Sequence, residues 1–156
     1  MGQLFPYEPL LQSPEAHGQL SVLRQDASTV HAELDGVKIS FMSYPHPMLY
    51  PTHPYNAVVL ADEHDIAAMK LSAIAGRGAK KDFIDLHVLL KQYSLEELLE
   101  CAGRKFARRN YNRLHLIKSL TYFDDAEEEP MPVMLQSITW DAVKDTMKKH
   151  ASRLVG

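Results

Sequence analysis

The sequence is poor in cysteine, with Cys101 as its single thiol in 156 residues. One thiol cannot form a disulfide within the chain, which excludes a disulfide-stabilised scaffold and suits a reducing compartment. No apolar run approaches the ~20 residues that span a bilayer. The first residues also lack the basic and then apolar pattern of a signal peptide. We therefore expect a cytoplasmic protein without a membrane-spanning segment.

The sequence also lacks an excess of positive charge. Its formal net charge is -3 at pH 7, so any binding to nucleic acid or to an anionic membrane must come from a local patch. Hydrophobic residues make up 46% and charged residues 24% of the chain, which is ordinary for a globular protein. A chain of this length is predicted to form one domain with its own core.

Alternation of apolar and polar residues marks the N-terminal part. Three segments with this pattern predict short antiparallel strands: residues 19–25, 29–34 and 37–43. Asp35-Gly36 favours a two-residue hairpin between the second and third segments, because both residues tolerate positive φ. The alternation predicts one core face on the last two strands, formed by Val30, Ala32, Leu34, Val37, Ile39 and Phe41.

Helical patterns follow a proline-rich stretch. The prolines in residues 44–54 predict an extended crossing loop, which leads to a short apolar strand at 57–61. Four or five helices are then predicted, with an acidic linker at 124–132: residues 62–75, 79–92, 94–106, 111–122 and 140–154. The chain is thus predicted to be α+β, with a β-rich part at 1–61 and a helical part at 62–156 of one continuous domain.

Three predicted helices begin with capping residues. Asp62 followed by Asp65, and Ser94 followed by Glu97, match the spacing of a capping box. In that motif the second side chain reaches back to the backbone of the first. Thr139 is expected to cap the last helix.

Charged residues recur at helical spacing in and after the first predicted helix. Lys70 lies among apolar residues, and Arg77 lies two turns further along the same face. Asp82 and Asp85 are one turn apart in the next helix. One explanation is an ion network that joins two packed helices. The other is a polyphosphate site, in which the cations neutralise phosphate oxygens and the aspartates orient them or help to hold a divalent metal.

The stretch DIAAMKLSAIAGRGAKKDFIDLHVLL at 65–90 resembles the C-terminal signature of the AbiEii/AbiGii toxin family of nucleotidyltransferases. The preceding hairpin and the SLTYFDD segment at 119–125 add to the resemblance. The family is similar to minimal, polymerase-β-like nucleotidyltransferases. The resemblance therefore implies a partial nucleotidyltransferase fold, with transfer of a nucleotide from an NTP, with Mg²⁺, to an RNA or protein acceptor.

The same resemblance assigns roles to residues. It implies that Lys70 contacts the nucleotide and that Asp82 is the late catalytic acid. It further implies that Arg77, Lys81 and Asp85 bind the nucleotide or support the site. As a toxin family, it also implies an antitoxin as a partner.

The family's metal site has no counterpart in this sequence. Family members place an Asp-x-Asp pair after a Gly-Ser or Gly-Gly turn, and the pair binds two metal ions. The only aspartates in residues 1–40 are Asp26 and Asp35. We therefore expect no metal ligands and an N-terminally truncated, catalytically incomplete protein that is inactive or very weak alone. The alternative is a non-catalytic interaction module that homodimerises, or complements a separately encoded first half, through a sheet edge and apolar surface.

A basic run near the end of the third helix and the start of the fourth has two explanations. It could contact RNA phosphates, or it could be a solvated helix end favoured by the macrodipole. Its residues are Arg104, Lys105, Arg108, Arg109 and Arg113.

Three other features have structural explanations beside functional ones. His46, His53 and His64 have no metal-ligand spacing and are expected to be polar loop residues. The acidic run 127–129 could mimic phosphate for a basic partner or be a solvated linker. Cys101 lies on an apolar helix face and is expected to be a buried structural thiol.

Overall fold

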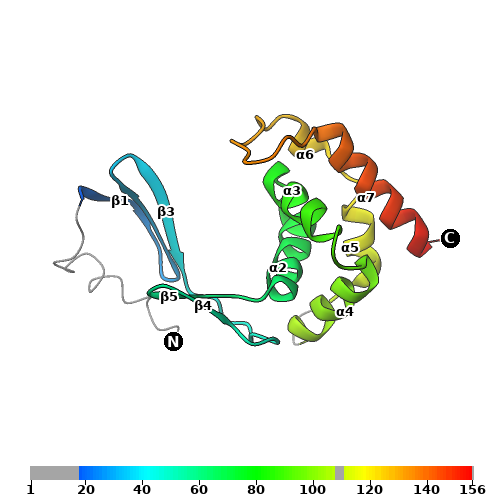
Figure 1. Ribbon diagram of the computed structural model, residues 1–156, viewed down its shortest axis with the longest axis horizontal. Helices are drawn as coiled ribbons and strands as arrows, with labels where there is room; N and C mark the ends of the chain where they lie inside the picture. Colours follow the sequence, from blue (N-terminus) through cyan, green and yellow to red (C-terminus); the bar gives the residue numbers. More distant parts are fainter. Residues whose placement is uncertain (1–17, 108–110, 156) are drawn as a thin grey trace. The chain divides into compact units, whose positions relative to one another are not determined.

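A computed structural model describes residues 18–107 and 111–155 of the chain (Figure 1). The chain divides into one compact unit that ends at Pro45 and a second that begins at His46. The first contains an antiparallel sheet, and the second contains a β-hairpin and the helices, so the predicted α+β class is confirmed. In the part of the chain that the structure describes, no helix is long and apolar enough to cross a membrane.

The first unit is built on a sheet with the strand order β1-β2-β3. The strands are Leu20–Gln25, Thr29–Leu34 and Val37–Met42, close to the predicted bounds. Asp35 and Gly36 join β2 to β3 with φ of 49° and 82°, which confirms the hairpin. The Asp35 carboxylate also accepts a hydrogen bond from the backbone N–H of Gln19 at 2.8 Å.

The faces of this sheet follow the predicted alternation. Val30 lies opposite Phe41 and Ala32 lies opposite Ile39. Val30 and Ala32 are buried. The expected burial of Val37 is wrong, because this residue lies at the hairpin end and is exposed.

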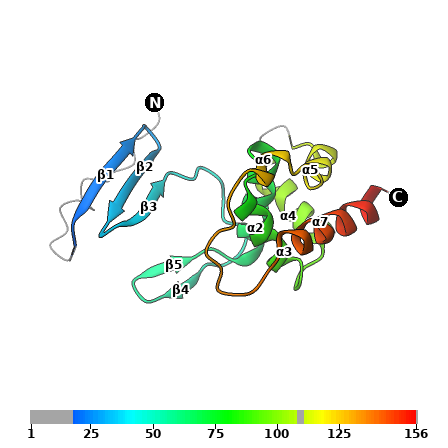
Figure 2. The same ribbon diagram turned by 90° about the horizontal axis from the view of Figure 1, so that it is seen from above.

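A second hairpin joins the crossing segment to the helices. β4 is His53–Tyr55 and β5 is Val58–Leu60, with Asn56 at φ 50° in the turn. The predicted strand at 57–61 is confirmed as β5, but the end of the predicted loop at 44–54 is itself a strand. Pro54 is tolerated there because a two-stranded ribbon has only edge strands. The hairpin belongs to the second unit, from whose helices it projects (Figure 2). The boundary between the compact units thus falls between residues 45 and 46 of the sequence, whereas the boundary between the predicted β-rich and helical parts falls between 61 and 62.

The central helix of the second unit is α2, Glu63–Gly76. It packs against α3 (Lys80–Leu89), α4 (Leu95–Lys105) and α5 (Arg113–Ser119). The long helix α7, Trp140–Val155, packs against the same three. Ala67, Leu71 and Ile74 lie on successive turns and form the buried side of α2. They belong to the same core cluster as Phe83 and Leu98. The apolar pattern that predicted these helices is thus satisfied by packing around α2.

The predicted acidic linker at 124–132 contains structure. A short helix, α6, covers Asp124–Glu127. Glu127 accepts a hydrogen bond from Lys144 of α7 at 2.8 Å, and the carboxylate of Glu129 accepts one from the backbone N–H of Lys80 at 2.7 Å. The linker prediction is therefore wrong for residues 124–127, which are helical, whereas residues 127–129 are exposed as predicted and also contact α7 and the start of α3.

The predicted helix caps are confirmed in part. Asp62 accepts a hydrogen bond from the backbone N–H of His64 at 2.9 Å. Ser94 accepts one from Glu97 at 3.2 Å, and Thr139 accepts one from Ala142 at 3.3 Å. The capping box at Asp62 is wrong in its second member, because the carboxylate of Asp65 binds elsewhere.

Asp65 forms a fully buried ion pair with Lys105. Both side chains have 0% exposure, and the ammonium lies 2.5 Å from Asp65 Oδ1. Lys105 also donates to the carbonyl of Pro47, and Asp65 accepts hydrogen bonds from the backbone N–H groups of Leu49 and Tyr50. Burial alone would raise the pKa of Asp65, but the hydrogen bonds from Lys105 and from these amides outweigh it and lower that pKa. The pair ties the crossing segment to α2 and α4, so both explanations offered for Lys105 are wrong.

The thiol of Cys101 lies near this ion pair and is buried, as predicted. It donates a hydrogen bond to the carbonyl of His64 at 3.4 Å. Burial raises the pKa of the Cys101 thiol, which keeps it protonated at neutral pH. Cys101 is therefore a packing residue between α2 and α4.

Replacing Lys105 with Met should lower the free energy of unfolding by about 3 to 5 kcal/mol, because the buried Asp65 charge then loses its cation. Urea denaturation measures this difference. Arg113→Gln is the matched control, because it removes the exposed ion pair with Glu96 and should cost less than about 1 kcal/mol. Equal effects of the two variants would contradict this description of the core.

Candidate functional site

Four charged side chains meet where α2 is joined to α3. Lys70 comes from the middle of α2, and Arg77 is the residue that ends that helix. Asp82 and Asp85 come from the first turns of α3. The turn between the helices is short because Gly78 adopts φ 57°, a conformation that glycine takes without strain. Its backbone N–H bonds back to the carbonyl of Ala73 at 3.3 Å, which folds α3 against α2.

The four side chains form one ion network. The Lys70 ammonium lies 2.6 Å from Asp85 Oδ2 and 3.2 Å from Asp82 Oδ1. The other oxygen of Asp82 accepts from Arg77, at 3.1 Å from Nε and 3.0 Å from Nη2. Asp82 thus divides its two oxygens between two cations. The structure thus contains the ion network that was one of the two explanations for the spacing of these charges.

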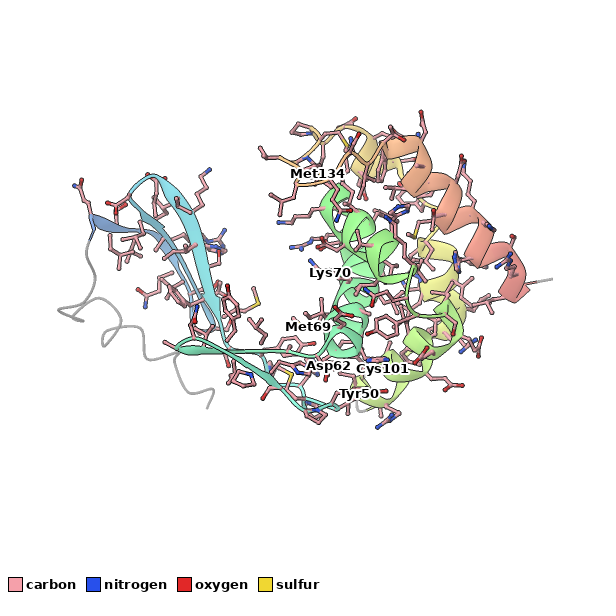
Figure 3. All side chains as sticks on the ribbon, viewed as in Figure 1. Tyr50, Asp62, Met69, Lys70, Cys101 and Met134 are labelled. Atoms are coloured by element: carbon pink, nitrogen blue, oxygen red, sulfur yellow. The ribbon has the colours of Figure 1, made fainter. Side chains whose placement is uncertain are left out.

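Burial differs strongly across this network. The side chain of Asp82 is 1% exposed, that of Lys70 25%, that of Asp85 48% and that of Arg77 61%. Asp82 is therefore the fixed centre, and solvent reaches the network both at Arg77 and at Lys70 with Asp85. Figure 3 shows Lys70 midway along α2, with Asp62 and Cys101 near the first turn of that helix.

The protonation of Lys70 limits what it can do. Burial would lower the pKa of Lys70, but its hydrogen bonds to Asp85 and Asp82 outweigh burial and raise that pKa. At neutral pH the side chain is therefore an ammonium and cannot serve as a general base. It can neutralise an anionic ligand such as a phosphate oxygen.

The residues around this network do not fit a divalent metal ion. Both aspartates already bind cations of the chain itself. Within residues 18–107 and 111–155, no group of three or more His, Cys, Asp and Glu side chains could hold a metal. A magnesium ion would need carboxylates from outside this site.

Lys81 neighbours Asp82 in sequence but has no ion pair or hydrogen bond with the network among the described residues. Its side chain is exposed. It lines a cavity of about 300 Å³ together with Asp85 and apolar residues such as Met134 of the segment between α6 and α7 (Figure 3). Its implied contact with a nucleotide stays a prediction.

The basic run at the end of α4 does not act as one group. Arg104 is exposed, and its guanidinium lies 5.9 Å from the ring centre of Tyr50. Arg113 forms an ion pair with Glu96. Arg108 and Arg109 lie outside the described residues. An RNA contact by Arg104 or Arg113 stays a prediction.

The sequence did not reveal a cluster around His64 at the start of α2. The imidazole stacks on Tyr50 and lies against Tyr93, each with ring centres 4.4 Å apart. Its Nδ1 lies 2.8 Å from an Asp62 oxygen and its Nε2 lies 3.1 Å from a Glu97 oxygen. The expectation of a plain polar loop residue is therefore wrong for His64. The predicted helix cap at Asp62 was the sequence signal for this cluster, because a capping carboxylate binds the backbone N–H two positions later, which is that of His64.

The charges of this cluster support one another. Burial would lower the pKa of His64, but its hydrogen bonds to Asp62 and Glu97 raise it above the ordinary 6.5. Burial would raise the pKa of Asp62, but hydrogen bonds from the His64 backbone, His53 and the His64 ring lower it to about 2. The His64 ring therefore bridges two carboxylates, which favour its protonated form, and joins the start of α2 to α4.

Comparisons with known proteins give one family match and one uncharacterized relative. The sequence model described as "Nucleotidyl transferase AbiEii toxin, Type IV TA system" matches residues 20–153. The uncharacterized protein aq_aa25 of Aquifex aeolicus (strain VF5) is 38% identical over 133 residues, which cover 81% of this chain. The match spans 62% of the length of that relative. No solved structure matches the chain.

The stability of the fold should fall as His64 loses its proton. Because its pKa is raised in the folded protein, the contribution of His64 is fully present below pH 6.5 and is lost as the pH rises through the folded pKa. We expect the free energy of unfolding of the wild type to drop between pH 6 and pH 8 relative to that of His64→Gln, as measured by urea denaturation.

The comparison with His64→Gln is needed because other histidines act in the opposite direction. Burial lowers the pKa of His87 and of His150, so each adds stability as the pH rises. Parallel pH profiles for wild type and variant would show that the His64 bridge does not stabilise the fold.

Proposed function

Because this chain belongs to the AbiEii nucleotidyl transferase toxin family, we propose that it takes part in the transfer of a nucleotide. In this proposal Lys70 and its ion network bind the phosphates of an NTP, and the reaction takes place in the cytoplasm. The observation that carries the proposal is the state of Lys70, an ammonium at neutral pH that is held by buried Asp82 and is partly open to solvent.

The unequal burial of the two aspartates gives them different roles. Asp82 is buried and shared with Arg77, so it positions Lys70 whether or not a ligand is present. Asp85 is half exposed and binds the same ammonium. A triphosphate can replace Asp85 because it brings negative charge to the same position. Asp85 then turns to solvent, where a carboxylate is well hydrated.

The isolated chain is proposed to bind nucleotide without transferring it. Transfer within this superfamily needs an Asp-x-Asp pair that holds two metal ions. The 156 residues contain no such pair after a Gly-Ser or Gly-Gly turn. Activity would therefore require these carboxylates from a further polypeptide segment, and Lys70 with Asp82 would complete that site.

The partners follow from the family and remain part of the proposal. A type IV toxin-antitoxin family suggests an antitoxin that restrains the complete enzyme. The acceptor is proposed to be RNA, with Arg104 and Arg113 as candidate phosphate contacts. Arg104 is the better placed of the two, because Arg113 is already paired with Glu96.

A second candidate function is an interaction module without catalysis. The observation that favours it is the β4–β5 hairpin, in which the six residues of the two strands are all exposed. Tyr55, Val58, Val59 and Leu60 place apolar side chains on it. Among the described strands, none pairs with its outer edges. Such a hairpin can dimerise or accept a strand from a complementing half.

Purified residues 1–156 should not transfer label from an α-labelled NTP to RNA in the presence of Mg²⁺, because the metal carboxylates are missing. Gel autoradiography measures the product. Adding a polypeptide with the Gly-Ser turn and the Asp-x-Asp pair should restore transfer, and Lys70→Gln should then reduce it at least about 100-fold. Metal-dependent transfer by the isolated chain would overturn the proposal.

The interaction module is tested by the state of association. Sedimentation at increasing concentration should reveal a dimer that Val59→Lys disrupts, because a charge on β5 opposes pairing of exposed edges. Gln92→Lys is the matched control at an exposed position in the turn after α3 and should leave the dimer intact. A wild-type monomer at high concentration would argue against homodimerisation through this hairpin.

A further inference from the structure

A cavity of about 520 Å³ lies where the C-terminal end of α2 meets α5 and α6. This volume is within the range of ordinary small-molecule sites, about 300 to 1,000 Å³. Part of its wall is the SLTYFDD segment at 119–125, for which the ion network offers no explanation. The cavity lies in the second unit and opens beside Arg77 rather than beside Lys70.

Two cationic side chains reach this cavity from different elements. Arg77 lines it from the end of α2 and Lys118 lines it from α5, where His115 is a further lining residue. Arg77 uses Nε and Nη2 on Asp82, which leaves further N–H donors of its guanidinium for a ligand. The Lys118 side chain is exposed, and its ammonium has no ion pair with any described residue. Cations of this kind suit an anionic group such as phosphate.

Other lining groups suit a ligand that is more than an anion. Tyr122 presents an exposed aromatic ring, on which a base can stack. Asp125 lines the same cavity and can accept hydrogen bonds from hydroxyl or amino groups. A ligand that matches all three features carries a phosphate, an aromatic ring and hydrogen-bond donors.

We propose that this cavity binds a phosphorylated nucleoside unit at a position distinct from the Lys70 network. The unit is either a free nucleotide or one nucleotide of an RNA strand, and this identity rests on the proposed function. Lys118 and Arg77 bind the phosphate, Tyr122 stacks on the base, and Asp125 accepts from the sugar or the base. Arg77 then joins this cavity to Asp82, since it contacts both.

The binding is tested by NMR titration of the labelled full chain. The probes are the backbone signals of Gly76 and Gly78, which line the cavity, with Gly36 of the β2–β3 hairpin as the internal control. The ligands are CMP, AMP and a short RNA with or without a 5′-phosphate. We expect Gly76 and Gly78 to shift while Gly36 stays in place. Shifts with CMP or AMP identify a free nucleotide as the ligand. Shifts with the RNA but with neither CMP nor AMP identify an RNA strand as the ligand.

Variants separate this cavity from the Lys70 site. Lys118→Gln should weaken binding about tenfold, because it removes a charge-assisted contact. Lys91→Gln, at an exposed position near the end of α3, should leave binding unchanged. Lys70→Gln should weaken binding in the cavity less than Lys118→Gln does, because it reaches the cavity only through Asp82 and Arg77.

Two results would overturn the inference. One is the absence of shifts at Gly76 and Gly78 with every ligand. The other is loss of those shifts in Lys70→Gln with no effect of Lys118→Gln, which would assign the binding to the ion network. If transfer is not restored by the added polypeptide with the Asp-x-Asp pair, that result counts against the proposed function and leaves the cavity's affinity as measured.

Discussion

A carboxylate that leaves water needs a cation to stabilise its charge, and Asp82 has two, Lys70 and Arg77. This arrangement explains why an apolar helix carries a lysine in its middle. It also explains the short turn at Gly78, because α3 must begin close to the end of α2 for Asp82 to reach both cations. The geometry of the candidate site therefore depends on one buried carboxylate at the junction of two helices.

The other end of α2 is held by a second buried carboxylate with a different purpose. Asp65 and Lys105 are fully enclosed and tie the crossing segment to α2 and α4. No part of that pair is open to a ligand, whereas Lys70 and Asp85 are partly exposed. The two ion pairs show why burial, and not charge alone, separates a structural contact from a candidate binding group. With both ends fixed, Lys70 is held in place before any ligand arrives.

The sequence predicted the elements well because their signals are local. The alternation around Asp35-Gly36 gave the sheet and its hairpin, and the caps at Ser94 and Thr139 gave two helix starts. The sequence-based predictions failed where a side chain binds a partner that is distant in the sequence. Asp65 had the spacing of a capping box but binds Lys105, 40 positions away, and the acidic run pairs with Lys80 and Lys144. Helical spacing placed Lys70 near Asp82, but it could not show that Asp82 is buried while Asp85 is half exposed.

The central claim is that Asp85 occupies the position on Lys70 that a triphosphate takes, while Asp82 only positions that lysine. The most direct test is the NTP affinity of Asp85→Asn, measured by NMR titration without metal and compared with wild type. Removing a competing carboxylate should tighten binding several-fold, because the Lys70 ammonium is then held only by Asp82 on the buried side. Unchanged or weaker NTP binding by Asp85→Asn would contradict the claim and leave the network a purely structural contact.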